Sequence, residues 1–130
     1  YIFFLNYSWL VPLRTLALMH EPINFHCTPL PFGQGGAPIE NMILRDFEET
    51  VITAHRMTAE LDAGPIYGTR GPISLAGTKE QILERFIDPV CDLITWIVTE
   101  NPEPVPQVGE VVLFKRLPHD AYVKFWEMRT

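Results

Sequence analysis

The chain has 130 residues, of which 47% are hydrophobic and 12% aromatic. This composition is enough for one domain with a core and excludes an intrinsically disordered chain. Sixteen acidic residues against ten basic ones give a net charge of −6, and no cluster of Lys and Arg stands out. A surface that tracks nucleic-acid phosphates is therefore not expected within these residues.

The cysteines and the apolar runs bear on cellular location. Cys27 and Cys91 lack the spacing of a disulfide framework or a metal knuckle. No apolar run is long enough to span a membrane. We therefore expect a reducing, cytoplasmic setting, with no membrane partner. Tyr1 is not an initiator residue, and apolar residues at helical spacing continue almost to Thr130, so we expect a fragment of a longer protein.

The first half of the chain alternates strand and helix signals. The apolar run Tyr1–Asn6 predicts a strand covered on both faces. Tyr7–Pro12 is then a turn, and Leu13–His20 a short helix that packs inward. A second strand spans Ile23–His26, and after a loop rich in Pro and Gly a helix begins at Pro38. This order is typical of a parallel α/β fold.

In the second half, a polar link at Asp46–Thr50 leads into an alternating strand at Val51–Met57. Ile66–Ser74 is extended but interrupted by Gly and Pro, which predicts an irregular edge strand. Thr78 and Gln81 form a capping box that opens the longest helix. The remaining predictions are a kink in that helix at Pro89, a Pro-rich connector at Asn101–Pro106 and a strand at Val111–Lys115.

The second strand ends in two polar side chains. Asn24 and His26 are two residues apart, so both point to one face of a strand while Phe25 points to the other. The following Pro/Gly segment reads as a shaped loop at the carboxyl end of the strand, where α/β sheets bind ligands. Cys27 should face away from His26, which argues against a thiol nucleophile activated by that histidine.

Each candidate has an ordinary alternative when taken alone. A histidine at a strand end is more often structural than catalytic, and Asn24 or Asp62 could simply be turn residues. The loop Gly33–Gly36 lacks the spacing of a dinucleotide or phosphate fingerprint. The other histidines share no metal-ligand spacing, so they read as surface or packing residues and no metal is expected; they are His20, His55 and His119.

Together, Asn24, His26 and Asp62 suit acyl transfer. An aspartate can orient an imidazole and increase its basicity, the imidazole can accept the proton of an attacking amine, and the amide can donate to the oxyanion. No Ser or Cys nucleophile is needed for this chemistry.

The order of motifs resembles the folate-dependent formyltransferases. The residues that carry the resemblance are Asn24, Phe25, His26, Pro31, Gly35, Pro38 and Leu61–Ile66. The resemblance implies a Rossmann-like formyltransferase fold of class α/β, with a mostly parallel sheet flanked by helices and truncated at the N-terminus. It further implies that residues 1–115 are the C-terminal portion of the catalytic domain and that 116–130 begin a C-terminal extension.

The same resemblance assigns roles to residues. It implies that Asn24, His26 and Asp62 are the catalytic triad. It also implies a pocket for the co-substrate 10-formyltetrahydrofolate between a Leu-Val-Pro turn and the loop that carries Asp62. The pocket residues are Leu10, Val11, Pro12, Leu61, Ala63, Gly64 and Ile66.

One departure bears on the acceptor. Family members that act on tRNA or a ribonucleotide carry a basic residue where this chain has Gln34. This favours an N-formyltransferase that acts on a small primary amine, an amino sugar on a nucleotide, over methionyl-tRNA. A noncatalytic folate- or nucleotide-binding module and a 10-formyltetrahydrofolate hydrolase remain open, and a homo-oligomer could form through the C-terminal extension.

Overall fold

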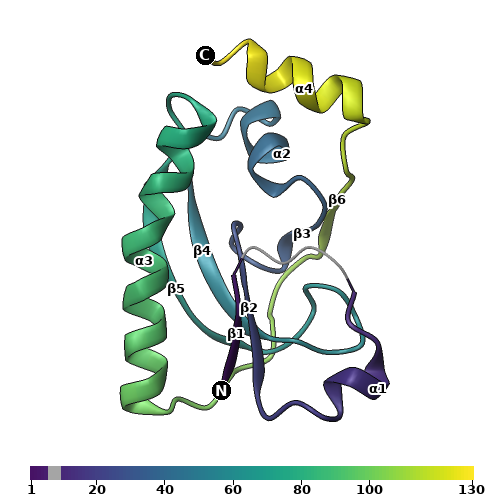
Figure 1. The fold of residues 1–130 in the computed structure, drawn as a ribbon, viewed down its shortest axis with the longest axis vertical. Coiled ribbons are helices and arrows are strands. Elements are labelled where there is room, and N and C mark those ends of the chain that lie inside the picture. The colour runs from purple at the N-terminus through teal and green to yellow at the C-terminus, as the bar shows by residue number, and fades with distance from the viewer. Residues whose placement is uncertain (6–9) are drawn as a thin grey trace.

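The computed structural model describes residues 1–5 and 10–130, and its strands and helices are interspersed along the chain (Figure 1). In chain order they are β1 (Ile2–Phe4), α1 (Leu13–Leu16), β2 (Pro22–His26), β3 (Phe32–Gly35), α2 (Pro38–Leu44), β4 (Glu49–Arg56), β5 (Ile66–Ser74), α3 (Lys79–Glu100), β6 (Val112–Phe114) and α4 (His119–Glu127).

Four strands form the main sheet in the order β1-β2-β4-β5. β1 pairs with β2 in parallel, whereas β2 with β4 and β4 with β5 pair antiparallel. β3 and β6 form a separate parallel pair. The predicted α/β class is confirmed, and within the described residues the pairing is mixed, because β4 and β5 run as a hairpin rather than as successive crossovers.

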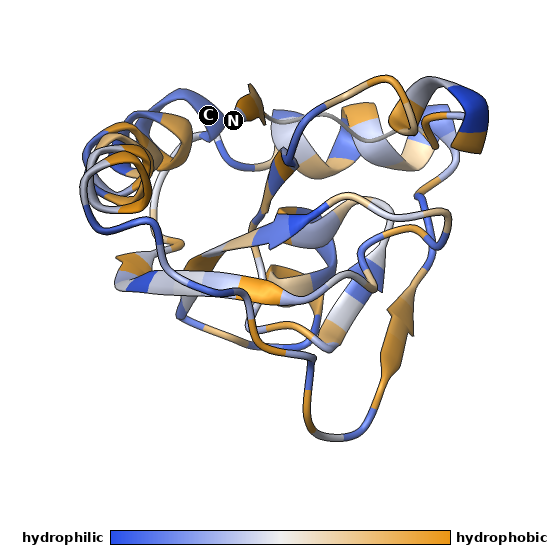
Figure 2. Ribbon diagram, turned by 90° about the horizontal axis from the view of Figure 1, so that it is seen from below, coloured by the Kyte–Doolittle hydropathy of each residue, from blue (hydrophilic) through white to orange (hydrophobic). Residues whose placement is uncertain are grey.

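α3 covers one face of the sheet, and Figure 2, which looks along the long axis, shows it standing beside the strands. Its capping box is present, since the Thr78 side chain accepts from the Gln81 amide at 3.2 Å and the Gln81 side chain accepts from the Thr78 amide at 3.0 Å. The buried side chains of α3 form one apolar stripe, which consists of Ile82, Phe86, Leu93 and Ile97. The helix continues through Pro89.

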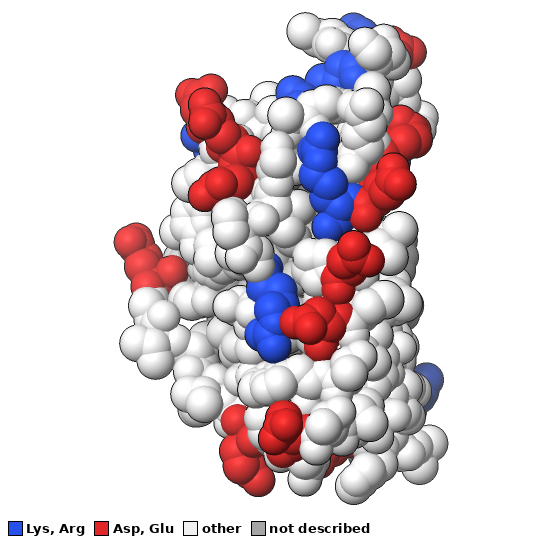
Figure 3. Space-filling model, turned by 90° about the vertical axis from the view of Figure 1, so that its left-hand side faces the viewer, with Lys and Arg blue, Asp and Glu red and all other residues white. Residues whose placement is uncertain are grey.

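The face over α3 carries charges of both signs, interspersed rather than gathered (Figure 3). Arg70 of β5 and Asp92 of α3 form an ion pair across it, with Nε and Oδ2 2.5 Å apart. This face therefore presents no continuous basic surface. Among the described helices, none is long and apolar enough to cross a membrane.

Several predicted boundaries are wrong. The loop after β2 contains β3, because its glycines permit backbone conformations that pair with β6. β4 begins at Glu49, inside the segment predicted as a polar link, and α1 ends at Leu16, earlier than the predicted His20. In place of the predicted strand Tyr1–Asn6, β1 ends at Phe4. Asn6 and residues 7–9 of the predicted turn lie outside the described residues.

Candidate active site

β2 delivers Asn24 and His26 to one face of the sheet. Both side chains are buried, with 3% and 7% exposure, and they lie opposite His55 and Thr53 of β4 in the antiparallel register. Thr53 in turn donates to the carbonyl of Thr28 at 2.6 Å, which holds the chain where it leaves β2. The alternation expected from the sequence therefore brings the amide and the imidazole together.

Asp62 reaches the same place from the loop between β4 and β5. It is 4% exposed and has a left-handed backbone, with φ of 56°. Its Oδ2 accepts a hydrogen bond from the Gly35 amide at 3.0 Å, and its Oδ1 lies 3.6 Å from His26 Nδ1. The structure thus brings the three predicted catalytic residues to one edge of the sheet.

The contacts of His26 indicate where its protons lie. Nε2 is 2.7 Å from the Gly33 carbonyl oxygen, which can only accept, so Nε2 carries a proton. A neutral ring would then present a lone pair from Nδ1 to the Asp62 carboxylate, which is unfavourable. The imidazolium, with a proton on each nitrogen, satisfies both contacts.

His55 is also part of this site, although the spacing of the histidines indicated only a surface or packing residue. It is 2% exposed, its Nδ1 donates to the Arg56 carbonyl at 3.1 Å, and its Nε2 lies 3.7 Å from Asp62 Oδ1. Burial lowers the pKa of His55, and the Arg56 carbonyl and the Asp62 carboxylate oppose that shift. Its position on the same face as Thr53 in an alternating strand was the available signal.

Two glycines let the segments approach. Gly35 has φ of 109°, and a Cβ there would collide with the carbonyl oxygen of Phe114 in β6. At Gly64 a Cβ would collide with the Arg56 carbonyl oxygen. A side chain at Gly35 would push β3 away from β6, and one at Gly64 would push the Asp62 loop away from the end of β4.

A small pocket opens beside Asn24, His55 and Asp62. Its apolar wall includes Leu10, Val11, Met57 and Leu61, and its polar wall also includes Thr58 and Glu60. The pocket measures about 10 Å³ in this structure, which is room for about one water molecule. An apolar pocket that ends in an amide and a carboxylate suits a flat heterocycle with polar edges.

The other predicted pocket residues lie elsewhere. Pro12 is exposed at the start of α1, and Ala63 lines a separate groove on the far side of its loop. Gly64 is buried against Arg56. Ile66 exchanges backbone hydrogen bonds with Val105 at 2.7 and 2.8 Å. Only the first half of the predicted loop wall, through Asp62, faces the pocket, because the chain then turns into β5.

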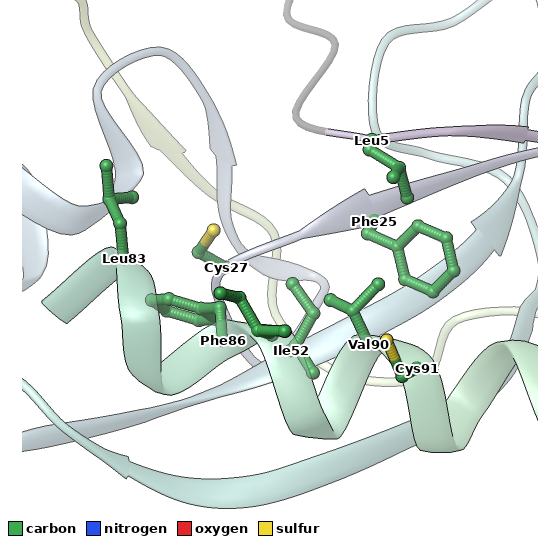
Figure 4. Close-up of a pocket in the computed structure, with 9 residues that line it drawn as sticks. Leu5, Phe25, Cys27, Ile52, Leu83, Phe86, Val90 and Cys91 are labelled. Atoms are coloured by element: carbon green, nitrogen blue, oxygen red, sulfur yellow. The ribbon is translucent and has the colours of Figure 1, made fainter. Parts of the chain in front are cut away.

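Cys27 faces the opposite side of β2. With Phe25 it lines an apolar pocket of about 280 Å³ between the sheet and α3 (Figure 4). Burial raises the pKa of the Cys27 thiol to about 12. This agrees with the expectation that the thiol is not a nucleophile beside His26. Within residues 1–5 and 10–130, no group of three or more His, Cys, Asp or Glu residues is arranged to hold a metal ion.

Known proteins are similar to this chain in both sequence and architecture. Methionyl-tRNA formyltransferase of Acidothermus cellulolyticus is 33% identical over 129 residues, a match that covers 92% of this chain and 39% of the relative. The structure of methionyl-tRNA formyltransferase from Clostridium thermocellum superimposes with a TM-score of 0.81 at 31% identity, covering 92% of this chain and 53% of that one. The chain belongs to the formyltransferase family.

The formyltransferase fold extends to a more distant structure. The formyltransferase PseJ from Anoxybacillus kamchatkensis, in complex with UDP-4,6-dideoxy-4-formamido-L-AltNAc and tetrahydrofolate, has a TM-score of 0.75. It is 21% identical, with coverage of 95% of this chain and 68% of that one, so the likeness concerns the fold alone. No family model matches the chain. Among the relatives compared, the chain spans between 35% and 41% of their length.

Proposed function

We propose that the protein transfers the formyl group of 10-formyltetrahydrofolate to a primary amine. The observation that carries this proposal is the convergence of Asn24, His26 and Asp62, with His26 Nδ1 3.6 Å from the carboxylate and both side chains buried. The family of the chain supports the same reaction. Asn24, His26 and Asp62 are the proposed catalytic residues, and Leu10, Val11 and Leu61 would hold the folate.

The proposed reaction is an acyl transfer. The acceptor nitrogen bonds to the formyl carbon, and the Asn24 amide donates to the formyl oxygen as it gains negative charge. His26 takes a proton from the attacking nitrogen through Nε2, and Asp62 stabilises the resulting imidazolium. The bond from the formyl carbon to the folate nitrogen then breaks, and His26 returns the proton to that nitrogen.

These reaction steps require a free lone pair on Nε2 of His26. Its Nε2 donates to the Gly33 carbonyl in this structure, so it has no lone pair for an incoming proton. The acceptor amine must replace that carbonyl as the partner of Nε2, with His26 in its neutral form. A small shift of the loop at Gly33 is therefore part of the proposed cycle.

Two acceptors are favoured by different observations. The relatives with 33% and 36% identity are methionyl-tRNA formyltransferases, which favours methionyl-tRNA. Gln34, by contrast, is 7% exposed and its amide is bonded to Gln107, so this rim of the site carries no charge. Without a positive charge at Gln34, this loop offers no cation for a tRNA phosphate. This, together with the UDP-linked formamido sugar bound by PseJ, favours a nucleotide-linked amino sugar as the acceptor.

The test uses the full-length protein with 10-formyltetrahydrofolate and follows the release of tetrahydrofolate. Parallel reactions contain methionyl-tRNA, a nucleotide-linked 4-amino sugar or no amine. Release that requires one amine identifies the acceptor, and release without amine indicates a hydrolase. His26→Ala should lower turnover by roughly 10²–10⁴-fold, whereas His20→Ala, which alters an exposed histidine, should not. Folate binding without turnover in any reaction would indicate a binding module and refute the proposal.

A further inference from the structure

Gln107 lies in the connector between α3 and β6 and uses all of its side-chain polar groups on this site. Its Nε2 donates to the carbonyl oxygens of Asp62 and Gly64 at 2.7 and 2.9 Å. Its Oε1 accepts from Gln34 Nε2 at 3.0 Å. A carboxamide nitrogen has two protons, so one side chain binds the Asp62 loop at two points.

We propose that Gln107 is a positioning residue that aims the Asp62 carboxylate at His26. This inference rests on the formyl transfer proposed above. Asp62 has a left-handed backbone, with φ of 56°, which L-residues adopt less readily than glycine. Within its own loop, the hydrogen bond from the Ala63 amide to Glu60 is long, at 3.4 Å. The bonds from Gln107 to Asp62 and Gly64 are shorter and act on the backbone that sets the direction of the carboxylate.

The contact with Gln34 extends this support to the other side of the carboxylate. Gln34 precedes Gly35, the residue whose amide donates to Asp62 Oδ2. The paired amides of Gln34 and Gln107 therefore connect the segment that carries the carboxylate to the segment that binds it. Both the direction of Asp62 and the place of its backbone donor depend on Gln107.

The test compares Gln107→Met with wild type in the full-length protein. Methionine keeps the length of the side chain but removes both donors and the acceptor. We expect kcat to fall about 10- to 100-fold, as for a misplacement of about 1 Å at a catalytic group. Val108→Ala, at the neighbouring position with 86% exposure, is the matched control and should leave kcat unchanged. Gln107→Asn, whose shorter amide cannot reach both carbonyls, is a second variant that should also lose activity.

A double-mutant cycle separates positioning from a general structural role. If Gln107 acts through the carboxylate, Gln107→Met should have little further effect on kcat in the Asp62→Asn background. A multiplicative loss in the double variant, or full kcat in both Gln107 variants, would overturn the proposal.

A second readout does not depend on turnover. The backbone amide resonance of Gly35 reports its hydrogen bond to Asp62 Oδ2. It should move in Gln107→Met as it does in Asp62→Asn, and stay in place in Val108→Ala. An unmoved Gly35 resonance in Gln107→Met refutes the positioning role. Failure of the wild type to transfer formyl to any amine, with the resonance moved, refutes only the proposed function.

Discussion

Replacement of Gly35 by alanine should destabilise the protein and lower its activity together. Gly35 has φ of 109°, where an added Cβ collides with the Phe114 carbonyl. The backbone conformation costs roughly 1–2 kcal/mol, and about 0.4–1 kcal/mol is recovered because alanine restricts the unfolded chain. Overpacking against backbone adds about 1–3 kcal/mol. The expected loss in unfolding free energy is therefore about 1–5 kcal/mol.

Gly109→Ala separates the two contributions. Gly109 has a similar φ of 123°, but a Cβ there would meet Pro31 only at an ordinary 3.7 Å. We expect that variant to lose about 1 kcal/mol and to keep its turnover, because it makes no contact with Asp62. Urea unfolding of the full-length variants gives the free energies, and tetrahydrofolate release gives kcat. Equal losses of stability in the two variants would refute the collision at Gly35, and full kcat in Gly35→Ala would refute its role as a donor to Asp62.

Three further predictions concern individual groups. Because the pKa of Cys27 is raised to about 12, iodoacetamide at pH 8 should label the exposed Cys91 well before Cys27; equal labelling rates by mass spectrometry would contradict this. Because burial lowers the pKa of His55, the unfolded state binds the extra proton below about pH 6.5. Unfolding free energy should therefore fall with decreasing pH by up to about 1.4 kcal/mol per unit, and His55→Gln should reduce that slope. Thr78→Ala should cost about 1 kcal/mol by loss of the α3 cap, and an unchanged urea midpoint would refute that contribution.

Local patterns predicted much of the fold. Alternation on β2 correctly placed Asn24 and His26 on one face, with Cys27 directed away from them. The Thr78 capping box gave the start of α3 to the residue, because that signal is a direct hydrogen-bond pattern. Strand-end and loop signals also predicted that Asn24, His26 and Asp62 lie close together, as they do in the structure, and their catalytic roles stay a proposal.

What depends on distant pairing could not be predicted from sequence. β3 exists because β6, far along the chain, pairs with a segment whose glycines suggest a loop. The sequence indicates only that His55 belongs to an alternating strand, and its closeness to Asp62 is a consequence of the tertiary structure. Gln107 follows the predicted Pro-rich connector and no sequence motif marks it, since its three partners come from two other segments. Side-chain roles of this kind depend on tertiary structure rather than on local pattern.

The support of Asp62 from Gln107 also bears on the order in which the molecule folds. The Gln107 contacts join residues 45 and 73 positions apart, and Asn41 is joined to Lys115 across 74. Closing such long segments requires α3 and its connector to be in place first, so these contacts form late. Because Val105, Pro106 and Val108 around Gln107 are exposed, we expect its contacts to open at lower free energy than the hairpin of β4 and β5. The proposed site should therefore form last in folding and be lost first under denaturing stress, while the sheet beneath it stays intact.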